Sequence, residues 1–282
     1  MTKYERIAVE PLGEAVGAEV SGVELSGSVE DEEIAELRAA FAQHGVLFFR
    51  DQSLTPERQI AFAERWGKIV VNRFFTPLEG YPQVAEVRKE PHQALNIGGG
   101  WHTDHSYDEI PALGSILSAQ ELPDEGGDTL FAGMAAAYDA LSEGLKETLS
   151  GLRALHSSRH VFGEGAELPG ELKERLGNPE KATQDAVHPV VITHPLSGRK
   201  VLYVNPGFTR RFDGWSHEES QPLLQYLYEH AAQPEFTCCF QWHPGSVAFW
   251  DNRATWHYAL NDYPGKRRLM HRITLDGEAL SR

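Results

Sequence analysis

The sequence has little cysteine, no long apolar run and no excess of basic residues. Its two cysteines, Cys238 and Cys239, are adjacent, so on a strand their thiols would point to opposite faces. This arrangement argues against a structural disulfide, and no CxxC spacing typical of a zinc site is present. No stretch approaches the length of a membrane span, and the amino terminus lacks an apolar signal segment. We therefore expect a cytoplasmic protein that does not bind membranes.

Acidic residues outnumber basic ones, with 41 Asp and Glu against 26 Lys and Arg, which gives a formal net charge of −15 among 282 residues. This negative charge argues against a surface that binds nucleic acids or anionic membranes in general. A small anionic substrate would instead need local positive charge. Hydrophobic content of 41% and charged content of 24% are ordinary for a soluble globular protein.

Many short strand patterns and a few helical ones fill the chain. Ser28-Val29-Glu30-Asp31 has the form of a capping box before a helix that ends at Gly45. A helical segment over residues 135–152 is expected to be interrupted near Ser142, and residues 187–204 have the pattern of a hairpin. Many short strands with turn signals favour a β-sandwich or jelly roll.

Metal-ligating residue types occur at His102 and Asp104, within Trp101-His102-Thr103-Asp104. On a strand, side chains spaced i, i+2 share one face. His257 is the best candidate for a third ligand. Two histidines and one carboxylate on one face of an ion leave open positions opposite, which is the facial triad of non-heme Fe(II) oxygenases.

Two arginines follow this third ligand. Arg268 and Arg272 alternate along an expected strand, with Met270 between them, so both side chains can point inward. A buried arginine needs an anionic partner, because an unpaired buried charge is costly. A dicarboxylate would supply one, since the planar guanidinium binds a carboxylate through two parallel hydrogen bonds.

Four longer stretches carry a family resemblance. They are the opening YERIAVEPLGEAVGAEVSGVEL, then WHTDHSY, ELPDEGGDTLFAG and WDNRATWHYALNDYPGKRRLMHR. Together they resemble the taurine/2,4-dichlorophenoxyacetate dioxygenase family, whose members are Fe(II)- and 2-oxoglutarate-dependent oxygenases. The resemblance follows nearly the whole chain, in order and at the family's spacing.

The resemblance implies a mainly β fold with peripheral helices, a double-stranded β-helix (jelly roll). One domain would span residues 1–282. Residues roughly 73–100 and 155–185 would be insertions near the open end of the jelly roll, where loops carry function on a rigid scaffold. A homo-oligomer is also expected, because homo-oligomers are common in this family.

At the matching positions, the resemblance assigns Fe(II) to His102, Asp104 and His257. It assigns the distal carboxylate of 2-oxoglutarate to Thr129 and Arg268, while the other end of this cosubstrate chelates iron. The second cosubstrate is O2.

Substrate residues are also implied by the resemblance. Arg272 matches the position that holds the substrate's anionic group, and Phe162 and Phe208 match apolar pocket positions. Asn72 and Phe75 stand where taurine dioxygenases place a histidine and a tyrosine, which implies weaker polar contacts to taurine. We expect hydroxylation of a small organic anion of the aryloxyalkanoate, alkyl sulfate or sulfonate type. The C–O or C–S bond would break where the hydroxylated carbon carries such a leaving group.

Two other functions are considered for the same residues. A Zn(II) hydrolase would use the three ligands and a metal-bound water, but it gives Thr129 and Arg268 no role. A non-catalytic jelly-roll protein would bind a small anion and use the histidines structurally. Metal content and O2 dependence separate the first from an oxygenase, and ligand binding after chelation tests the second.

Overall fold

The computed structural model describes residues 4–166, 169–173 and 175–282. Residues 1–3 of the predicted domain, and positions 167, 168 and 174 of the predicted insertion 155–185, lie outside the described residues. No helix in the described ranges is long and apolar enough to cross a membrane.

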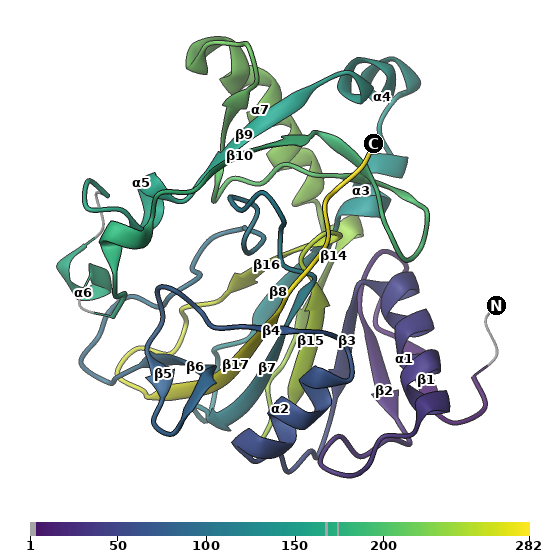
Figure 1. Cartoon of the computed structure of the whole chain (residues 1–282), viewed down its shortest axis with the longest axis vertical. Coiled ribbons are helices and arrows are strands. Elements are labelled where there is room, and N and C mark those ends of the chain that lie inside the picture. The colour runs from purple at the N-terminus through teal and green to yellow at the C-terminus, as the bar shows by residue number, and fades with distance from the viewer. Residues whose placement is uncertain (1–3, 167–168, 174) are drawn as a thin grey trace.

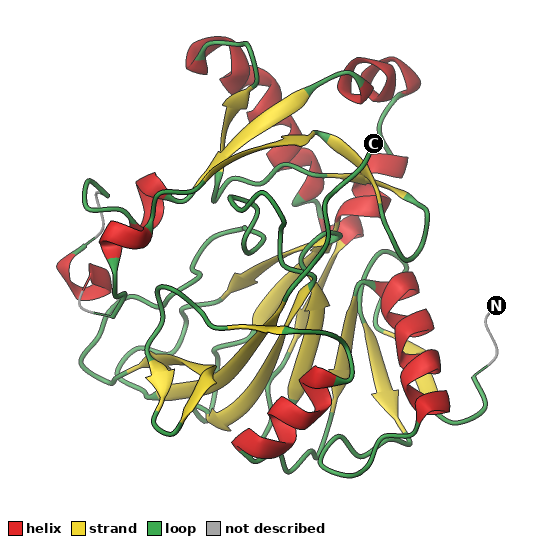
Figure 2. Cartoon of the chain, viewed as in Figure 1, coloured by secondary structure: helices red, strands yellow, loops and turns green. Residues whose placement is uncertain are grey.

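A large, mostly antiparallel sheet forms the base of the molecule (Figures 1 and 2). In spatial order the strands are β1 (Ala8–Pro11), β2 (Ala18–Ser21), β3 (Val46–Phe49), β15 (Val247–Asp251), β7 (Gly114–Glu121), β17 (Arg268–Leu275), β6 (Tyr81–Lys89) and β5 (Pro77–Leu78), with β4 (Ile69–Val70) paired to β17. The central strands β15, β7 and β17 pair side by side, and β2 and β3 form a parallel pair at one side.

A second antiparallel sheet faces the first and consists of β14 (Thr237–Phe240), β8 (Thr129–Gly133) and β16 (Thr255–Ala259). Apolar side chains from both sheets fill the space between them, among them Phe48, Phe131, Phe240 and Met270. The prediction of a mainly β double-stranded β-helix is confirmed.

Helices and short strands cover the outer faces of these sheets. Helices α1 (Asp31–His44) and α2 (Pro56–Glu64) pack on the outside of the large sheet, because its strands alternate apolar residues between the two faces. The outside of the small sheet is covered by α3 (Met134–Asp139), α4 (Glu143–Ser150), α7 (His217–Ala231) and the hairpin of β11 (Val191–Thr193) and β12 (Lys200–Leu202).

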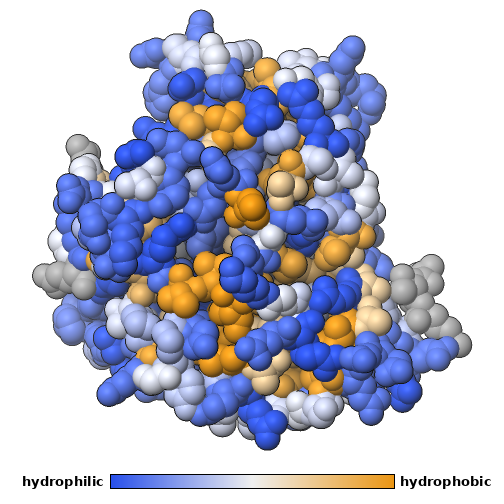
Figure 3. Space-filling view, in the orientation of Figure 1, coloured by the Kyte–Doolittle hydropathy of each residue, from blue (hydrophilic) through white to orange (hydrophobic). Residues whose placement is uncertain are grey.

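Strands β10 (Asp185–Pro189), β9 (Arg153–Ser157) and β13 (Thr209–Phe212) form a separate antiparallel sheet, and β9 and β10 run beside α7 at the top of Figure 1. Helices α5 (Arg159–Phe162) and α6 (Gly170–Lys173) lie at the left of that view, and η1 (Pro179–Lys181) follows them in the chain. The last element, η2 (Pro234–Phe236), packs Phe236 into the apolar cluster under α3 and α7. The face in Figure 3 is mainly hydrophilic, with hydrophobic residues in small separate areas.

Two local predictions need correction, and one is confirmed. The N-cap of α1 is Glu30 with Glu33 as its reciprocal partner, and not Ser28, because the helix begins two residues later than the Ser28 motif requires. The hairpin covers only β11 and β12, since residues 185–189 pair with β9 instead. The predicted interruption near Ser142 is confirmed, because the Ser142 side chain caps α4.

A buried ionic cluster joins the end of β15 to the loop after β11. Asp251, which is fully buried, accepts hydrogen bonds from the Arg253 guanidinium at 2.7 and 2.9 Å and lies 2.9 Å from His194 Nε2. Burial alone would raise the pKa of Asp251, but Arg253 and then His194 outweigh it and hold this pKa well below its usual range.

Replacing Arg253 with methionine should therefore destabilise the fold. Among the described residues, Asp251 would then keep only His194 as a side-chain partner, and breaking a buried ion pair in this way costs about 3–5 kcal/mol. Urea unfolding measures the free energy. As a control, Arg199→Met removes an exposed pair with Asp139 and should cost at most about 1 kcal/mol. Equal losses in the two variants would contradict this role for Arg253.

Candidate active site

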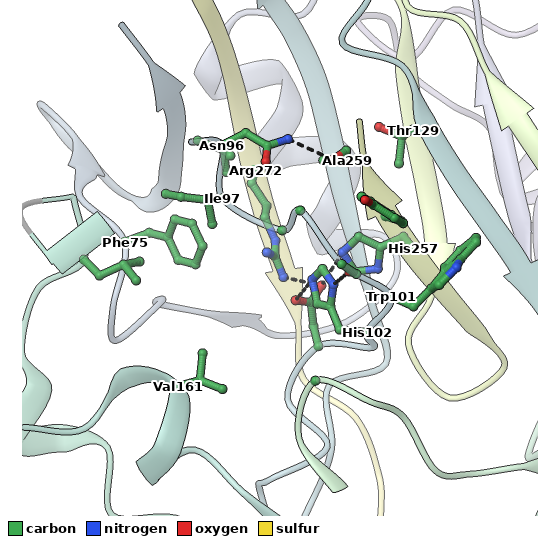
Figure 4. Close-up of a pocket in the computed structure, with 18 of the residues that line it drawn as sticks. Phe75, Asn96, Ile97, Trp101, His102, Thr129, Val161, His257, Ala259 and Arg272 are labelled. Atoms are coloured by element: carbon green, nitrogen blue, oxygen red, sulfur yellow. Dashed lines mark hydrogen bonds and ion pairs between the residues drawn. The ribbon is translucent and has the colours of Figure 1, made fainter. Parts of the chain in front are cut away.

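A cavity of about 660 Å³ reaches between the two sheets. Strands β6, β7, β15 and β17 of the large sheet line it together with β8 and β16 of the small sheet. Every predicted site residue contributes to its wall: Asn72, Phe75, His102, Asp104, Thr129, Phe162, Phe208, His257, Arg268 and Arg272. Figure 4 shows part of this wall.

His102, Asp104 and His257 come together inside the cavity. One possible ligand atom from each lies within 4.8 Å of the others. Asp104 carboxylate oxygens lie 3.8 Å from His102 Nε2 and 3.6 Å from His257 Nε2. This spacing suits three ligands around one ion, and imidazole with carboxylate suits a non-heme Fe(II) site.

The backbone that brings these ligands together differs from the expected strand. His102 forms a single antiparallel bridge with His257, in which each backbone N–H donates to the other residue's carbonyl at 3.2 and 2.8 Å. Asp104 already belongs to a turn. The prediction that a strand carries both residues is therefore wrong, because the chain turns away immediately after this bridge.

The electrostatics of the three side chains fit metal binding. Burial is the main cause that lowers the pKa of His257 well below its ordinary value, so its imidazole is neutral and keeps a lone pair. His102 Nδ1 lies 2.7 Å from the Gly100 carbonyl, which fixes the proton on Nδ1 and leaves Nε2 as the ligand atom. Burial would raise the pKa of Asp104, but the positive charge of Arg272 outweighs it and holds this pKa well below its usual range.

Arg272 lies beside the three possible ligands. Its Nη2 donates to Asp104 Oδ2 at 2.6 Å and to Ser115 Oγ at 3.1 Å, and Figure 4 shows it pointing toward His102. The guanidinium carbon lies 5.7 Å from the Phe75 ring centre and 5.8 Å from that of Trp250. Aromatic faces on the guanidinium stabilise its charge and leave it accessible to an anion at its edge.

Arg268 and Thr129 lie on neighbouring walls of the same cavity. Only 5% of Arg268 is exposed, and its Nε and Nη2 have no hydrogen-bond partner within the described residues. Thr129 Oγ1 accepts a hydrogen bond from Trp242 Nε1 at 3.0 Å, which leaves its own proton free to be donated. A buried guanidinium with free donors is costly unless an anion completes it.

Besides Arg272, the other four predicted substrate residues have distinct surroundings. Asn72 Oδ1 accepts the backbone N–H groups of Phe74 and Phe75 at 2.9 and 3.0 Å, so this side chain shapes the turn that presents Phe75. Phe162 stacks on Phe74 with ring centres 4.3 Å apart. Phe208 lies near His102, with ring centres 6.3 Å apart.

Other residues of the wall were not predicted. Several are aliphatic and come from loops or from the short helices α5 and α6, where no period of apolar residues marks an inward face; they include Leu95, Ile97, Val161, Leu172 and Leu176. The three glycines at residues 98–100 were the one local feature of the sequence that indicated a loop at the cavity wall. Gly98 adopts a φ of +79°, and a Cβ there would lie 3.3 Å from the His102 ring.

Comparison with known proteins identifies the group to which this site belongs. The model of the taurine catabolism dioxygenase TauD, TfdA family matches residues 8–274. The chain belongs to this family. It is therefore an enzyme of the 2-oxoglutarate-dependent dioxygenase class, as the resemblance implied.

Individual members of the TauD, TfdA family cover almost all of this chain. It is 36% identical to an alkylsulfatase of Acinetobacter baylyi, over 97% of this chain and 86% of that protein. It is 35% identical to an alpha-ketoglutarate-dependent sulfate ester dioxygenase of Pseudomonas putida, over 96% and 89%. The crystal structure of a taurine dioxygenase from Burkholderia xenovorans is 37% identical and superimposes with a TM-score of 0.81, over 98% and 93%.

Proposed function

We propose that this protein is an Fe(II)- and 2-oxoglutarate-dependent dioxygenase that hydroxylates a small organic anion with an apolar part. The observation that supports this proposal best concerns Arg268, whose buried Nε and Nη2 find no hydrogen-bond partner in the described part of the chain. Arg268 lines the same cavity as the neutral His257 and the two other possible ligands. Fe(II) would be held by His102, Asp104 and His257, and the distal carboxylate of 2-oxoglutarate by Arg268 and Thr129.

Each group of residues has a separate task in this reaction. When bound, Fe(II) supplies the oxidative chemistry that O2 and 2-oxoglutarate feed: one oxygen atom enters succinate, with release of CO2, and the other enters the substrate. Gly100 and the bridge to His257 orient His102. Arg268 and Thr129 fix the far end of 2-oxoglutarate, and Arg272 holds the substrate anion.

A sulfate ester, sulfonate or aryloxyalkanoate is the proposed substrate. Relatives named for alkylsulfatase and sulfate ester dioxygenase activity support this range. So do the aromatic residues Phe75, Phe162 and Phe208 in the cavity wall, of which Phe75 lies beside Arg272. Hydroxylation of the carbon that bears the ester oxygen of a sulfate ester gives a hemiacetal-type product. It collapses to a carbonyl compound and free sulfate.

Succinate formation tests the proposed function. The Fe(II)-loaded protein is incubated with 2-oxoglutarate, O2 and a panel of taurine, alkyl sulfates, alkylsulfonates and aryloxyalkanoates. We expect strong stimulation by one apolar anion class and little by taurine. Failure to bind Fe(II) or 2-oxoglutarate would overturn the proposal, and activity with Zn(II) in the absence of O2 would favour a hydrolase.

Replacing Arg272 with alanine should separate the two anion sites. One lost charged hydrogen bond costs about 1.5–3 kcal/mol, so the KM for substrate should rise by roughly 10–100-fold. The dissociation constant of 2-oxoglutarate should change little, because Arg268 holds its distal carboxylate. Calorimetry with the metal-loaded protein measures the latter. Equal weakening of both ligands would contradict this division.

Four further parts of the proposal rest on the sequence: the single domain, the two insertions, the cytoplasmic location and the homo-oligomeric state. We propose that the chain acts as one dioxygenase domain, with residues roughly 73–100 and 155–185 as insertions that shape the cavity. Asn72, Phe75, Leu95, Val161 and Phe162 from these segments or their edge line the cavity, which supports the second point. Cytoplasmic location and a homo-oligomeric state stay predictions.

A further inference from the structure

Helix α6 and the residues that follow it are bound to the loop before the metal ligands. The Glu171 carboxylate accepts the backbone N–H groups of Ala94 and Leu95 at 3.0 and 2.8 Å. From the next turn, Arg175 donates to the Leu95 carbonyl at 2.5 Å and to the Arg88 carbonyl. Two oppositely charged side chains therefore hold one short piece of loop at its donors and at its acceptor.

The same segment is also bound to the opposite wall. The Gly177 N–H donates to the Phe74 carbonyl at 2.8 Å, and Asn178 Nδ2 donates to the Arg73 carbonyl at 2.8 Å. Residues 170–173 and 175–178, here called the crossing segment, thus connect the loop at 94–95 with the turn at 72–75. Both connected pieces line the cavity, through Leu95 and Phe75.

The crossing segment faces the cavity with apolar side chains. Leu172 and Leu176 line the cavity and are four residues apart, with the Leu176 N–H donating to the Leu172 carbonyl at 3.2 Å. Such a spacing places both side chains on one face of a helical turn. Together with Phe75, Leu95, Ile97 and Val161 they form what we call the apolar end of the cavity.

The apolar end lies beyond Arg272 as seen from the cosubstrate residues. Figure 4 shows Phe75, Ile97 and Val161 on one side of the Arg272 guanidinium, with Thr129 and Trp101 on the other. Phe75 connects the apolar end with Arg272, because its ring centre lies 5.7 Å from the Arg272 guanidinium carbon. An anion held by Arg272 would therefore have its apolar remainder beside Phe75, with room in that direction for an extended group.

We infer that the apolar end selects substrates with an extended apolar group on the anion, and that Leu172 and Leu176 set the length of group that fits. This inference rests on the proposed function and adds its specificity-determining residues. The hydrogen bonds of Glu171, Arg175, Gly177 and Asn178 keep the two leucines at a fixed position relative to Arg272, so they act as a stop for a chain that grows from the anion.

The test is the binding of n-alkyl sulfates of increasing length. Calorimetry is performed without O2 on protein loaded with metal and 2-oxoglutarate. For the original protein, burial of each methylene at about 0.8 kcal/mol corresponds to an approximately fourfold lower dissociation constant, until the chain reaches the crossing segment and the gain stops. In Leu172→Trp the gain should stop at a shorter chain, while the shortest member binds unchanged.

Two substitutions that enlarge the apolar end, and one control substitution far from the cavity, complete the experiment. Leu172→Ala and Leu176→Ala should weaken only the longer sulfates, by several-fold, and they serve equally if the tryptophan variant does not fold. Leu196→Trp, on an exposed turn outside the cavity wall, should match the original protein throughout.

Two results would overturn the inference. One is an unchanged stopping length in every crossing-segment variant, and the other is the absence of any chain-length dependence in the original protein. Succinate formation by the original protein with the full substrate panel is measured separately, so a failure of the proposed function is distinguishable from a failure of this inference.

Discussion

Replacing His257 with alanine should abolish succinate formation and remove high-affinity Fe(II) binding. The side chain supplies one of three possible ligand atoms within 4.8 Å of one another, and burial keeps it neutral. Loss of an outer partner of a metal ligand already costs roughly 10–100-fold in affinity or activity, so loss of a ligand itself should cost more. Calorimetric titration with Fe(II) under exclusion of O2 measures the affinity.

His217→Ala is the matched control, because this histidine lies exposed on α7 and away from the cavity wall. It should bind Fe(II) and turn over like the original protein. Thermal unfolding of both apo variants checks that the His257 substitution leaves the fold intact. Full Fe(II) affinity in a folded His257→Ala variant would refute the assignment of this ligand.

Replacing Arg268 with methionine should weaken 2-oxoglutarate binding by about 100-fold or more. Two charge-assisted hydrogen bonds to a carboxylate are lost, at about 1.5–3 kcal/mol each. The apo protein should be as stable as before or more stable, because a buried guanidinium with unpaired Nε and Nη2 is replaced by an apolar side chain of similar length. Calorimetry gives the affinity, and urea unfolding gives the stability.

The Arg267→Met substitution removes the same charge from the residue directly before β17. Arg267 pairs with Glu121 and Glu90 at the surface, so 2-oxoglutarate binding should stay unchanged in this variant. If Arg267→Met weakened 2-oxoglutarate as strongly as Arg268→Met, overall charge and not a specific contact would explain the effect. Unchanged affinity in Arg268→Met would remove this residue from the cosubstrate site.

The strand pattern of the sequence is sufficient to predict that Arg268 and Arg272 lie on the same strand face. A strand has only two faces, so the period alone places Arg268, Met270 and Arg272 on the same face of β17. Both arginines are buried and line the cavity. Fold class and the three possible metal ligands were likewise predictable, because their residue types and order match a family whose members share one scaffold.

Secondary structure was predicted incorrectly where the sequence has no regular alternation of apolar and polar residues. The segment with His102 and Asp104 makes one bridge and then turns, so it was mistaken for a strand, although the two side chains still converge. Glu30 and not Ser28 caps α1, because two adjacent sets of residues offered similar capping chemistry and packing of the helix decided between them.

The sequence by itself indicated a double-stranded β-helix and a His/Asp/His ligand set, both implied by the family resemblance, and it placed two arginines on one face of a strand through the strand period. Only the tertiary structure decided what surrounds them. Arg272 pairs with Asp104, Asn72 shapes a turn, and Leu172 and Leu176 reach the cavity from a segment 70 or more residues beyond His102. These contacts join parts of the chain that are far apart, and no local pattern encodes which distant backbone groups Glu171 and Arg175 will bind.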